Sequence, residues 1–175
     1  TDENVLFKLE LLMKQAGITT DDRKVTVAAK EKATKSGVIS AAIELHDGTI
    51  ITSKTTSLLG ASAALILNAI KHLGNIPHES KLIPVSMIEP IQNMKVFYLK
   101  GNNPRLHTDE VLVTLAMLSL SDENCKKAIE QLPKIAGCQV HTTVMLSEVD
   151  KKIFKKLGVD VTMEPVLKVS KPVGR

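Results

Sequence analysis

The stretch from residue 38 to residue 73 constrains the fold more than any other part of the chain. It reads VISAAIELHDGTIITSKTTSLLGASAALILNAIKHL. The apolar run Val38–Leu45, the Asp47-Gly48 pair and the β-branched run Thr49–Thr52 predict two strands joined by a tight turn. The apolar residues Leu58–Leu73 then predict one long helix, whose small residues near its start allow close packing against a sheet. This hairpin and helix indicate an α/β fold.

Further helices and strands alternate along the rest of the chain. Amphipathic spacing and capping residues predict helices over residues 2–16, 20–35, 86–99, 108–118, 121–132 and 147–157, and strands over residues 81–85, 138–146 and 159–163. Such alternation predicts a mixed β-sheet with helices on both faces. The order of elements resembles the cytidine-deaminase-like three-layer sandwich, preceded by a helical segment. We expect an N-terminal helical segment at 1–36, the α/β domain at 37–164 and a flexible tail at 165–175.

The composition excludes several classes of protein. The net charge of +4 is spread along 175 residues, and aromatic residues make up only 2%, which argues against single-stranded nucleic acid as a partner. The longest apolar stretch, Leu58–Ile70, is shorter than the roughly 20 residues that a membrane helix needs. Cys125 and Cys138 lack a close spacing and are typical of reduced thiols. We therefore expect a soluble, cytoplasmic protein.

The deaminase resemblance can be tested on the residues that would hold zinc. Zinc deaminases need H-x-E at the helix after the hairpin and P-C-x-x-C at the next helix. The corresponding helix starts here read Gly60-Ala61-Ser62 and Glu89-Pro90-Ile91, and neither offers a ligand set. The sequence thus predicts a deaminase-like scaffold without the zinc site, and it indicates no other cofactor.

The densest group of polar residues lies between Gly101 and Glu110, in a loop that runs into a predicted helix. One interpretation makes His107 a general acid or base, Glu110 or Asp109 its orienting partner, and Arg105, with Asn103, an anion clamp. Free amides and the helix dipole would favour an anion at this place. The alternative is ordinary capping, with Thr108 as the N-cap and the two acidic residues facing the dipole.

A second candidate group lies on the strand predicted over residues 138–146. Period-two alternation places His141 and Thr143 on one face, and Cys138 on the other, which argues against a Cys138–His141 dyad. If His141 lies at an exposed strand end, it could meet His107 beside the carboxylates of Asp109 and Glu110. His141 would then be a catalytic partner of His107, or the two imidazoles and the carboxylates could bind a divalent metal. A hydrogen-bonded core histidine is the alternative.

A third candidate is the hydroxyl-rich loop before the long helix. Thr55, Thr56 and Ser57 could bind an anion through their hydroxyls and the helix amides, although capping by Ser57 explains them equally well. The loop lacks the phosphate-loop pattern G-x-x-x-x-G-K-[ST].

Several segments together resemble one bacterial family. ELLMKQAGIT, AAIELHDGTIIT, SLLGASAALILNAIK, IEPIQNMKV, GNNPRLHTDEVL, QLPKIAGCQVHTTVMLSEVD and FKKLGVDVTMEP occur in order over essentially the whole chain. They are similar to the C-terminal part of the domain of unknown function 1846 family, also called uncharacterised protein family 0371. The NPRLHTDEVL run is the most specific of them.

The resemblance implies a cytoplasmic, functionally uncharacterised bacterial protein with a cytidine-deaminase-like fold. Full-length members are longer and carry a Gly-rich, phosphate-loop-like stretch in their N-terminal part, so the chain is expected to be an excised C-terminal subdomain. No catalytic role can be carried over from the family. The leading hypothesis is a binding or catalytic subdomain for a phosphate- or carboxylate-bearing small molecule. The alternative is a module for oligomerisation or for packing against the N-terminal part, with exposed apolar surface on its first helix and on Leu58–Ile70.

Overall fold

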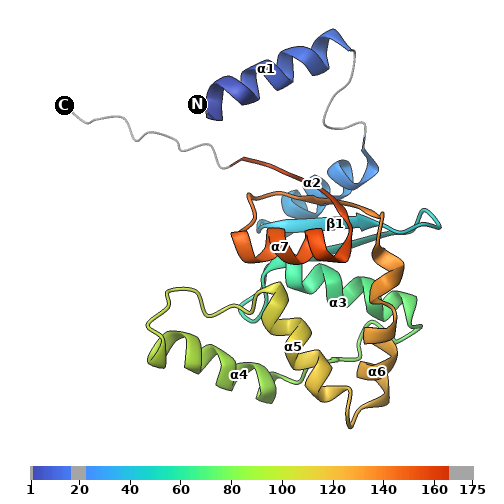
Figure 1. The fold of residues 1–175 in the computed structure, drawn as a ribbon, viewed down its shortest axis with the longest axis vertical. Coiled ribbons are helices and arrows are strands. Elements are labelled where there is room, and N and C mark those ends of the chain that lie inside the picture. Colours follow the sequence, from blue (N-terminus) through green and yellow to red (C-terminus); the bar gives the residue numbers. More distant parts are fainter. Residues whose placement is uncertain (1, 17–22, 166–175) are drawn as a thin grey trace.

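A four-stranded mixed sheet forms the centre of the computed structural model, which describes residues 2–16 and 23–165 (Figure 1). The strand order is β2-β1-β3-β4, with bounds Ile50–Lys54, Ser40–Glu44, Gln139–Thr142 and Asp160–Met163. β1 runs antiparallel to both of its neighbours, and β3 and β4 are parallel. The mixed sheet predicted from the sequence is therefore confirmed.

The predicted hairpin joins β1 to β2. The strands pair from Ser40 opposite Lys54 to Glu44 opposite Ile50. Gly48 has φ of +86°, a conformation that favours glycine, and the Asp47 carboxylate accepts a hydrogen bond from the Thr49 amide at 2.9 Å. The turn residues therefore fix the register on which both faces of the sheet depend.

Helices cover both faces of the sheet. α2 (Lys24–Ser36) packs on one face, while α3 (Ala61–Leu73) and α7 (Glu148–Leu157) pack on the other (Figure 1). A further group of helices packs against the far side of α3. It comprises α4 (Val85–Asn93), α5 (Thr108–Leu118) and α6 (Glu123–Glu130). The π-helix η2 (Met94–Tyr98) continues from α4 and has no buried residue. The 3₁₀ helix η3 (Leu132–Ile135) places Leu132 against this group and Ile135 in the core on the sheet side. α1 (Asp2–Gln15) stands apart from these layers in Figure 1.

α3 is buried on both sides and separates two apolar cores. On the sheet side its Leu65 packs with Ile43 of β1 and Phe154 of α7. On the other side its Ile70 packs with Leu115 of α5. This double burial explains why the helix is apolar nearly all round. It also contradicts the expectation that Leu58–Ile70 would expose an apolar surface.

Two local predictions are wrong. Residues 81–85 form no strand, because Leu82 and Ile83 enter the second core from a loop that leads directly into α4. A short apolar run cannot by its pattern distinguish a buried strand from a buried loop. Ser57 does not cap α3, since the helix begins at Ala61 after the N-cap Gly60.

Other helix and strand ends agree with the predicted ends, or the observed element is shorter than the predicted one. Gly37 and Gly158 end α2 and α7 in the left-handed conformation, and Asp122 and Ser147 cap α6 and α7, close to the ends of the helices predicted over 20–35, 121–132 and 147–157. The strand expected over residues 138–146 stops at Thr142. The first residues of the helix predicted over 20–35 and most of the predicted tail lie outside the described residues.

The expected division of the chain between residues 36 and 37 stays a prediction. α2 lies before that boundary, yet its Val25 and Ala29 share a core with Ala42 of β1. The helix is thus packed as part of the α/β body.

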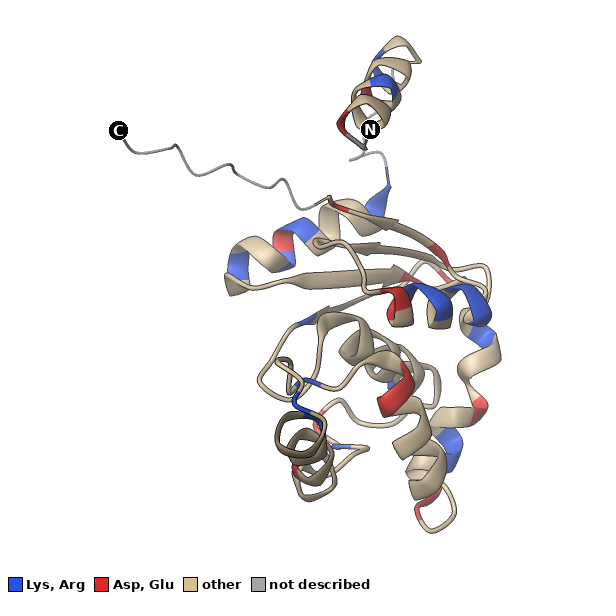
Figure 2. Cartoon of the chain, turned by 60° about the vertical axis from the view of Figure 1, so that its left-hand side comes forward, with Lys and Arg blue, Asp and Glu red and all other residues tan. Residues whose placement is uncertain are grey.

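Charged residues of both signs are interspersed along several helices (Figure 2). This distribution agrees with a net charge that is spread along the chain. In the described part of the chain, no helix combines the length and apolar character needed to cross a membrane.

Candidate functional site

The polar loop before α5 is held against the start of α3 by Leu106. The Leu106 amide donates to the Leu58 carbonyl at 3.0 Å, and the Gly60 amide donates to the Leu106 carbonyl at 3.3 Å. The Leu106 side chain is fully buried in the second core. Because Leu106 is anchored on both its backbone and its side chain, Arg105 and His107 on either side of it are held near the first turn of α3.

His107 and Glu110 form a close pair at the first turn of α5. The Glu110 carboxylate accepts the His107 amide at 2.9 Å and lies 3.1 Å from the imidazole Nδ1. The N-cap of α5 is therefore His107, and not Thr108 as the capping interpretation had it. We assign the ring proton to Nδ1, donating to Glu110, which leaves the Nε2 lone pair available to accept a proton.

Lys95 completes this pair and was missed by sequence reasoning. Its ammonium group donates to Glu110 Oε1 at 2.8 Å and to the Arg105 carbonyl, and it lies 3.4 Å from His107 Nδ1. Partial burial acts to raise the pKa of Glu110, but the hydrogen bonds from Lys95 and from the His107 amide bring that pKa below its ordinary value. Glu110 is thus ionised, as an orienting carboxylate must be. A lone lysine on η2 carries no sequence signal of this role.

Asn103 and Arg105 lie on the solvent side of His107. The Asn103 amide nitrogen is 3.5 Å from His107 Nε2, and its side-chain oxygen accepts the Arg105 backbone amide at 3.1 Å. The Arg105 guanidinium donates through Nε to the Thr56 carbonyl at 2.6 Å. This single bond leaves the terminal nitrogens of the guanidinium without a hydrogen-bond acceptor among the described residues, as an anion clamp requires.

Asp150 of α7 is a second residue that the sequence did not reveal. Its Oδ1 accepts both the amide of Thr108, at 3.1 Å, and the Thr108 hydroxyl, at 2.7 Å. Thr108 is completely buried, so this contact ties the start of α7 to the start of α5. The spacing of Ser147 and Asp150 resembles a capping box and was the one available signal.

These elements enclose a cavity of about 210 Å³. Its wall includes the first residues of α3, the loop before α5, and the segment between β3 and α7. The lining residues are Ile39, Thr55, Gly60, Ala61, Ser62, Asn103, Arg105, His107, Thr142, Val144, Met145, Leu146, Ser147 and Asp150. Asn103, Arg105, His107 and Thr55, from two of the predicted groups, thus meet at one place.

The remaining residues of the hydroxyl-rich loop have structural partners. The Thr56 hydroxyl accepts the amides of Leu58 and Leu59, each at 3.2 Å, and the Ser57 carbonyl accepts Gln92. Of the three hydroxyl residues only Thr55 lines the cavity, where its Oγ1 accepts the Ala61 amide at 3.2 Å.

His141 is not brought to His107. It lies on the α2 face of the sheet, since the period of a strand turns it away from Thr142, which lines the cavity. Its Nδ1 is 2.7 Å from the Thr162 hydroxyl, and its Nε2 is 3.4 Å from Glu164. Burial lowers the pKa of His141, against the opposing effect of Glu164. The sheet therefore separates the two imidazoles that a composite site would join.

Thr143 and Asp109 are also occupied elsewhere. The Thr143 hydroxyl donates to the Ser40 carbonyl at 3.2 Å and accepts the Ser40 amide at 3.0 Å. Asp109 accepts the Glu110 amide at 2.8 Å and, within the described part of the chain, makes no hydrogen bond with the imidazole of His107. Glu110, and not Asp109, is the orienting partner in this geometry.

Neither cysteine is poised for nucleophilic chemistry. Burial raises the pKa of Cys125 to about 11 and also raises that of Cys138, so both stay protonated near neutral pH. Within residues 2–16 and 23–165, no three His, Cys, Asp or Glu side chains are grouped so that they could hold a metal ion.

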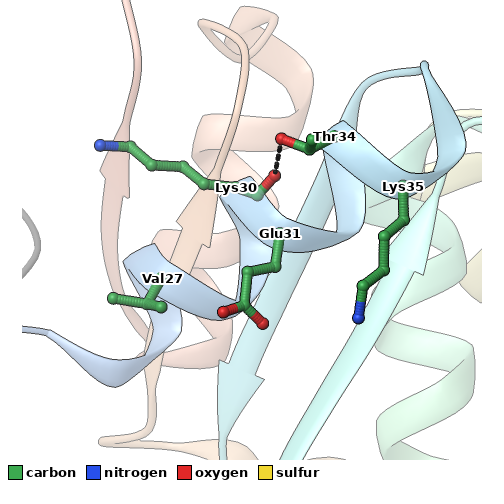
Figure 3. Close-up of a pocket in the computed structure, with 5 residues that line it drawn as sticks. All are labelled: Val27, Lys30, Glu31, Thr34 and Lys35. Carbon is green, nitrogen blue, oxygen red and sulfur yellow. Dashed lines mark hydrogen bonds between the residues drawn. The ribbon is translucent and has the colours of Figure 1, made fainter.

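A separate hollow lies on the outer side of α2 (Figure 3). Val27, Lys30, Glu31, Thr34 and Lys35 line it, and the Thr34 hydroxyl donates to the Lys30 carbonyl at 3.0 Å. All five residues come from one helix, and none belongs to the predicted site. The cavity beside His107 draws its walls from several elements and is the better candidate.

Comparison with known proteins gives one consistent result. The family described as Domain of unknown function DUF1846, C-terminal, matches residues 21–171. A UPF0371 protein of Corynebacterium urealyticum is 48% identical over 165 residues, which is 94% of this chain and 33% of that protein. A UPF0371 protein of Streptococcus sanguinis is 44% identical over 164 residues, again 94% of this chain and 33% of the relative. The chain spans about a third of the length of these relatives. The resemblance predicted from the sequence is confirmed.

Proposed function

The chain belongs to the DUF1846 family, and we propose that it binds a small anionic molecule, bearing phosphate or carboxylate, in the cavity beside His107. In the longer proteins of this family the site would form part of a larger binding or catalytic unit. The proposal extends to catalysis, with His107 as the proton acceptor and Glu110 as its orienting group.

One observation carries this proposal: the helices α3, α5 and α7 all begin at the cavity wall, where Arg105 is also found. Gly60, His107 and Ser147 are the N-caps of the three helices, and all three line the cavity. Each helix start contributes a partial positive charge, and the guanidinium adds a full one. A negatively charged group is the ligand that such a wall favours.

The geometry around His107 supports a role in proton transfer. Its side chain is about one-third exposed, so a ligand can reach the Nε2 lone pair. Nδ1 is held by a carboxylate that Lys95 keeps ionised. Nε2 has only the Asn103 amide nitrogen at 3.5 Å beside it, and an imidazole with Nδ1 fixed and Nε2 within reach of a ligand is the arrangement that general acid–base catalysis needs.

The finer description of the fold belongs to the same proposal. A hairpin followed by a buried helix, in a mixed sheet covered on both faces, supports a cytidine-deaminase-like scaffold. Ser62 stands at the start of α3, where a zinc deaminase would place ligand side chains, so the scaffold would serve chemistry other than zinc-dependent deamination.

A thermal-shift screen of the chain with phosphorylated and carboxylated metabolites tests the proposed function. Binding to the folded state raises the Tm. We expect stabilisation in the wild type, a much smaller response in Arg105→Gln and in His107→Ala, and a full response in His72→Ala, an exposed histidine on α3 that does not line the cavity. Equal responses in His107→Ala and the wild type would remove His107 from the site.

A second candidate function is docking of another part of the longer polypeptide, and the exposed aromatic residues of η2 favour it. Phe97 and Tyr98 are 65% and 75% exposed, with the adjacent Leu99 at 71%. Large exposed aromatic residues are typical of interfaces. Because the relatives are about three times as long as the matched region, the remaining two-thirds is the proposed occupant.

Hydrogen exchange can test this docking in a chimera that carries the chain in place of the matching third of the C. urealyticum relative. We expect the amides of η2 to be protected in the chimera and not in the chain alone. A Phe97→Ser/Tyr98→Ser variant should lose that protection. Protection in the isolated chain that grows with concentration would identify a second copy instead, and absence of protection in both proteins would reject the surface.

A further inference from the structure

The start of α3 is buried without a cap of its own. Its N-cap, Gly60, has an extended backbone and no side chain, and the first turn contains no acidic residue. Ala61, Ser62 and Ala63 are between 95% and 99% buried. A helix start in this position normally needs acceptors for its first amides, because water cannot reach them freely.

Two of these amides lack an acceptor. The Ala61 amide donates to the Thr55 hydroxyl, and the Ala64 amide donates to the Gly60 carbonyl. Among the described residues, no backbone or side-chain oxygen accepts a hydrogen bond from the amide of Ser62 or Ala63. Leaving a buried donor unpaired costs about 1–3 kcal/mol. Both amides stand in the first turn of α3, whose residues Gly60, Ala61 and Ser62 line the cavity, and first-turn N–H groups point out of the helix end.

The Ser62 side chain supplies an independent observation. It is 95% buried, lines the cavity, and its hydroxyl makes no hydrogen bond with the described residues. Elsewhere on the cavity wall, the hydroxyls of Thr55, Thr142 and Ser147 all have partners. The unpartnered hydroxyl belongs to the same helix turn as the two amides, so the start of α3 holds three donors.

We propose that the start of α3 is a phosphate seat, in which the amides of Ser62 and Ala63 and the Ser62 hydroxyl donate to the oxygens of a phosphate group. The inference rests on the proposed function of the same cavity and names the anionic group. A tetrahedral phosphate offers three terminal oxygens to three donors, whereas a carboxylate offers two. Arg105, on the same wall, is suited to neutralise the remaining charge.

The size and charge of the cavity restrict the ligand. About 210 Å³ is below the 300–1,000 Å³ of typical drug-sized sites, so a small phosphate ester fits the cavity better than a dinucleotide does. The Asp150 carboxylate also lines the wall and opposes a dianion, although its Oδ1 is engaged by Thr108. We therefore expect weak binding of inorganic phosphate alone.

Amide NMR of the chain, titrated with inorganic phosphate, tests the seat directly. We expect the Ser62 and Ala63 resonances to shift and saturate. Ser62→Asp places a carboxylate at the second position of α3 and should raise the Tm without phosphate while abolishing the phosphate response. Ser86→Asp is the matched control, because Ser86 is the second residue of α4 and is exposed. Ser86→Asp should keep the full response of the Ser62 and Ala63 amides to phosphate.

Ser62→Ala keeps the two amides and removes only the hydroxyl. This variant tests the phosphate seat if Ser62→Asp fails to fold. We expect about five- to tenfold weaker phosphate binding, the effect of one lost hydrogen bond. The seat would be overturned if phosphate did not shift the amide resonances of Ser62 and Ala63, or if Ser62→Asp responded to phosphate as the wild type does. If metabolites raise the Tm of the chain but phosphate does not shift these two amide resonances, the phosphate seat is rejected and the proposed function is kept. Saturating amide shifts without stabilisation by any metabolite would reject the proposed function and keep the seat.

Discussion

His107 and His141 are both paired with a glutamate, yet their surroundings differ in every other respect. His141 is 3% exposed and belongs to a closed chain of hydrogen bonds. Arg23 donates to the Thr162 hydroxyl at 2.6 Å, so that hydroxyl donates in turn to His141 Nδ1, and Nε2 is left to donate to Glu164. His107 is about one-third exposed, and its Nε2 faces Asn103 at the edge of a cavity.

The difference shows how the same residue types serve two purposes. In the His141 group each donor meets an acceptor, and the result stabilises the pairing of α2, β3 and β4. Around the His107 cavity, the Arg105 guanidinium and the start of α3 keep donors for which the described residues offer no acceptor. A group with unmet donors at a cavity is a candidate for ligand binding, whereas a group with every donor met is a structural element.

The largest effect should follow from replacing His141. We expect His141→Ala to lower the free energy of unfolding by about 2–3 kcal/mol, because it opens a cavity and leaves Thr162 and Glu164 without their partner. His107→Ala should lower it by less than about 1 kcal/mol, since solvent can replace the lost contacts. Urea denaturation of the two variants measures the difference. Equal losses would contradict the distinction between the two groups.

A smaller effect is expected from Lys95→Met. The ion pair with Glu110 is partly buried, so its loss should lower the free energy of unfolding by about 1 kcal/mol at pH 7 and return the pKa of Glu110 toward its ordinary value. Because the pKa of Glu110 is depressed in the folded state, this contribution is present above the ordinary pKa of 4.5 and is lost as the pH falls through the folded value.

The control for Lys95→Met is Lys151→Met, which removes an exposed pair with Glu148 on α7. It should change stability by less than about 0.5 kcal/mol. Carboxyl NMR titration of Glu110 checks the pKa. An unchanged Glu110 titration in Lys95→Met would show that Lys95 does not hold this carboxylate.

The last effect is a pH dependence that the His141 group confers on stability, only part of which falls between pH 5 and pH 7. The folded pKa of His141 lies below its ordinary 6.5, so the unfolded chain binds more protons between the two values. The contribution of His141 to the free energy of unfolding is complete above about pH 6.5 and is lost as the pH falls through the pKa of His141 in the folded state. The slope from this one group is at most about 1.4 kcal/mol per pH unit. The charged groups around the ring are Glu164, Lys30 and Arg23.

Urea denaturation at several pH values between 7 and 5 measures this slope. His141→Gln keeps a polar side chain and should show a flatter profile than the wild type. If the two profiles are parallel, the titration of His141 does not contribute to stability.

Local patterns predicted much of the fold. The Asp47-Gly48 turn, the glycines that end α2 and α7, and the caps Asp122 and Ser147 act within a few residues, so the sequence alone locates them. The pattern failed at residues 81–85, where the apolar character of Leu82 and Ile83 reflects burial under neighbouring helices and not strand pairing.

The residues of the candidate site also fall into two groups, those that the sequence predicted and those that only the structure revealed. The loop with Asn103, Arg105, His107 and Glu110 was predicted, because its members are neighbours in the chain. Lys95 and Asp150 were not, since they reach the site from η2 and α7. His141 was expected beside His107, and only the direction of its strand face decided otherwise.

The sequence by itself determined the hairpin, the N-caps of α6 and α7, the family and the residues on one side of the cavity, because each of these depends on short-range spacing or on a recognisable run of residues. Only the tertiary structure decided that three helix starts meet at one cavity, that Lys95 holds Glu110, and that the amides of Ser62 and Ala63 lack acceptors among the described residues. The physical reason is that a hydrogen bond depends on which groups packing brings together, and packing joins residues that the sequence places far apart.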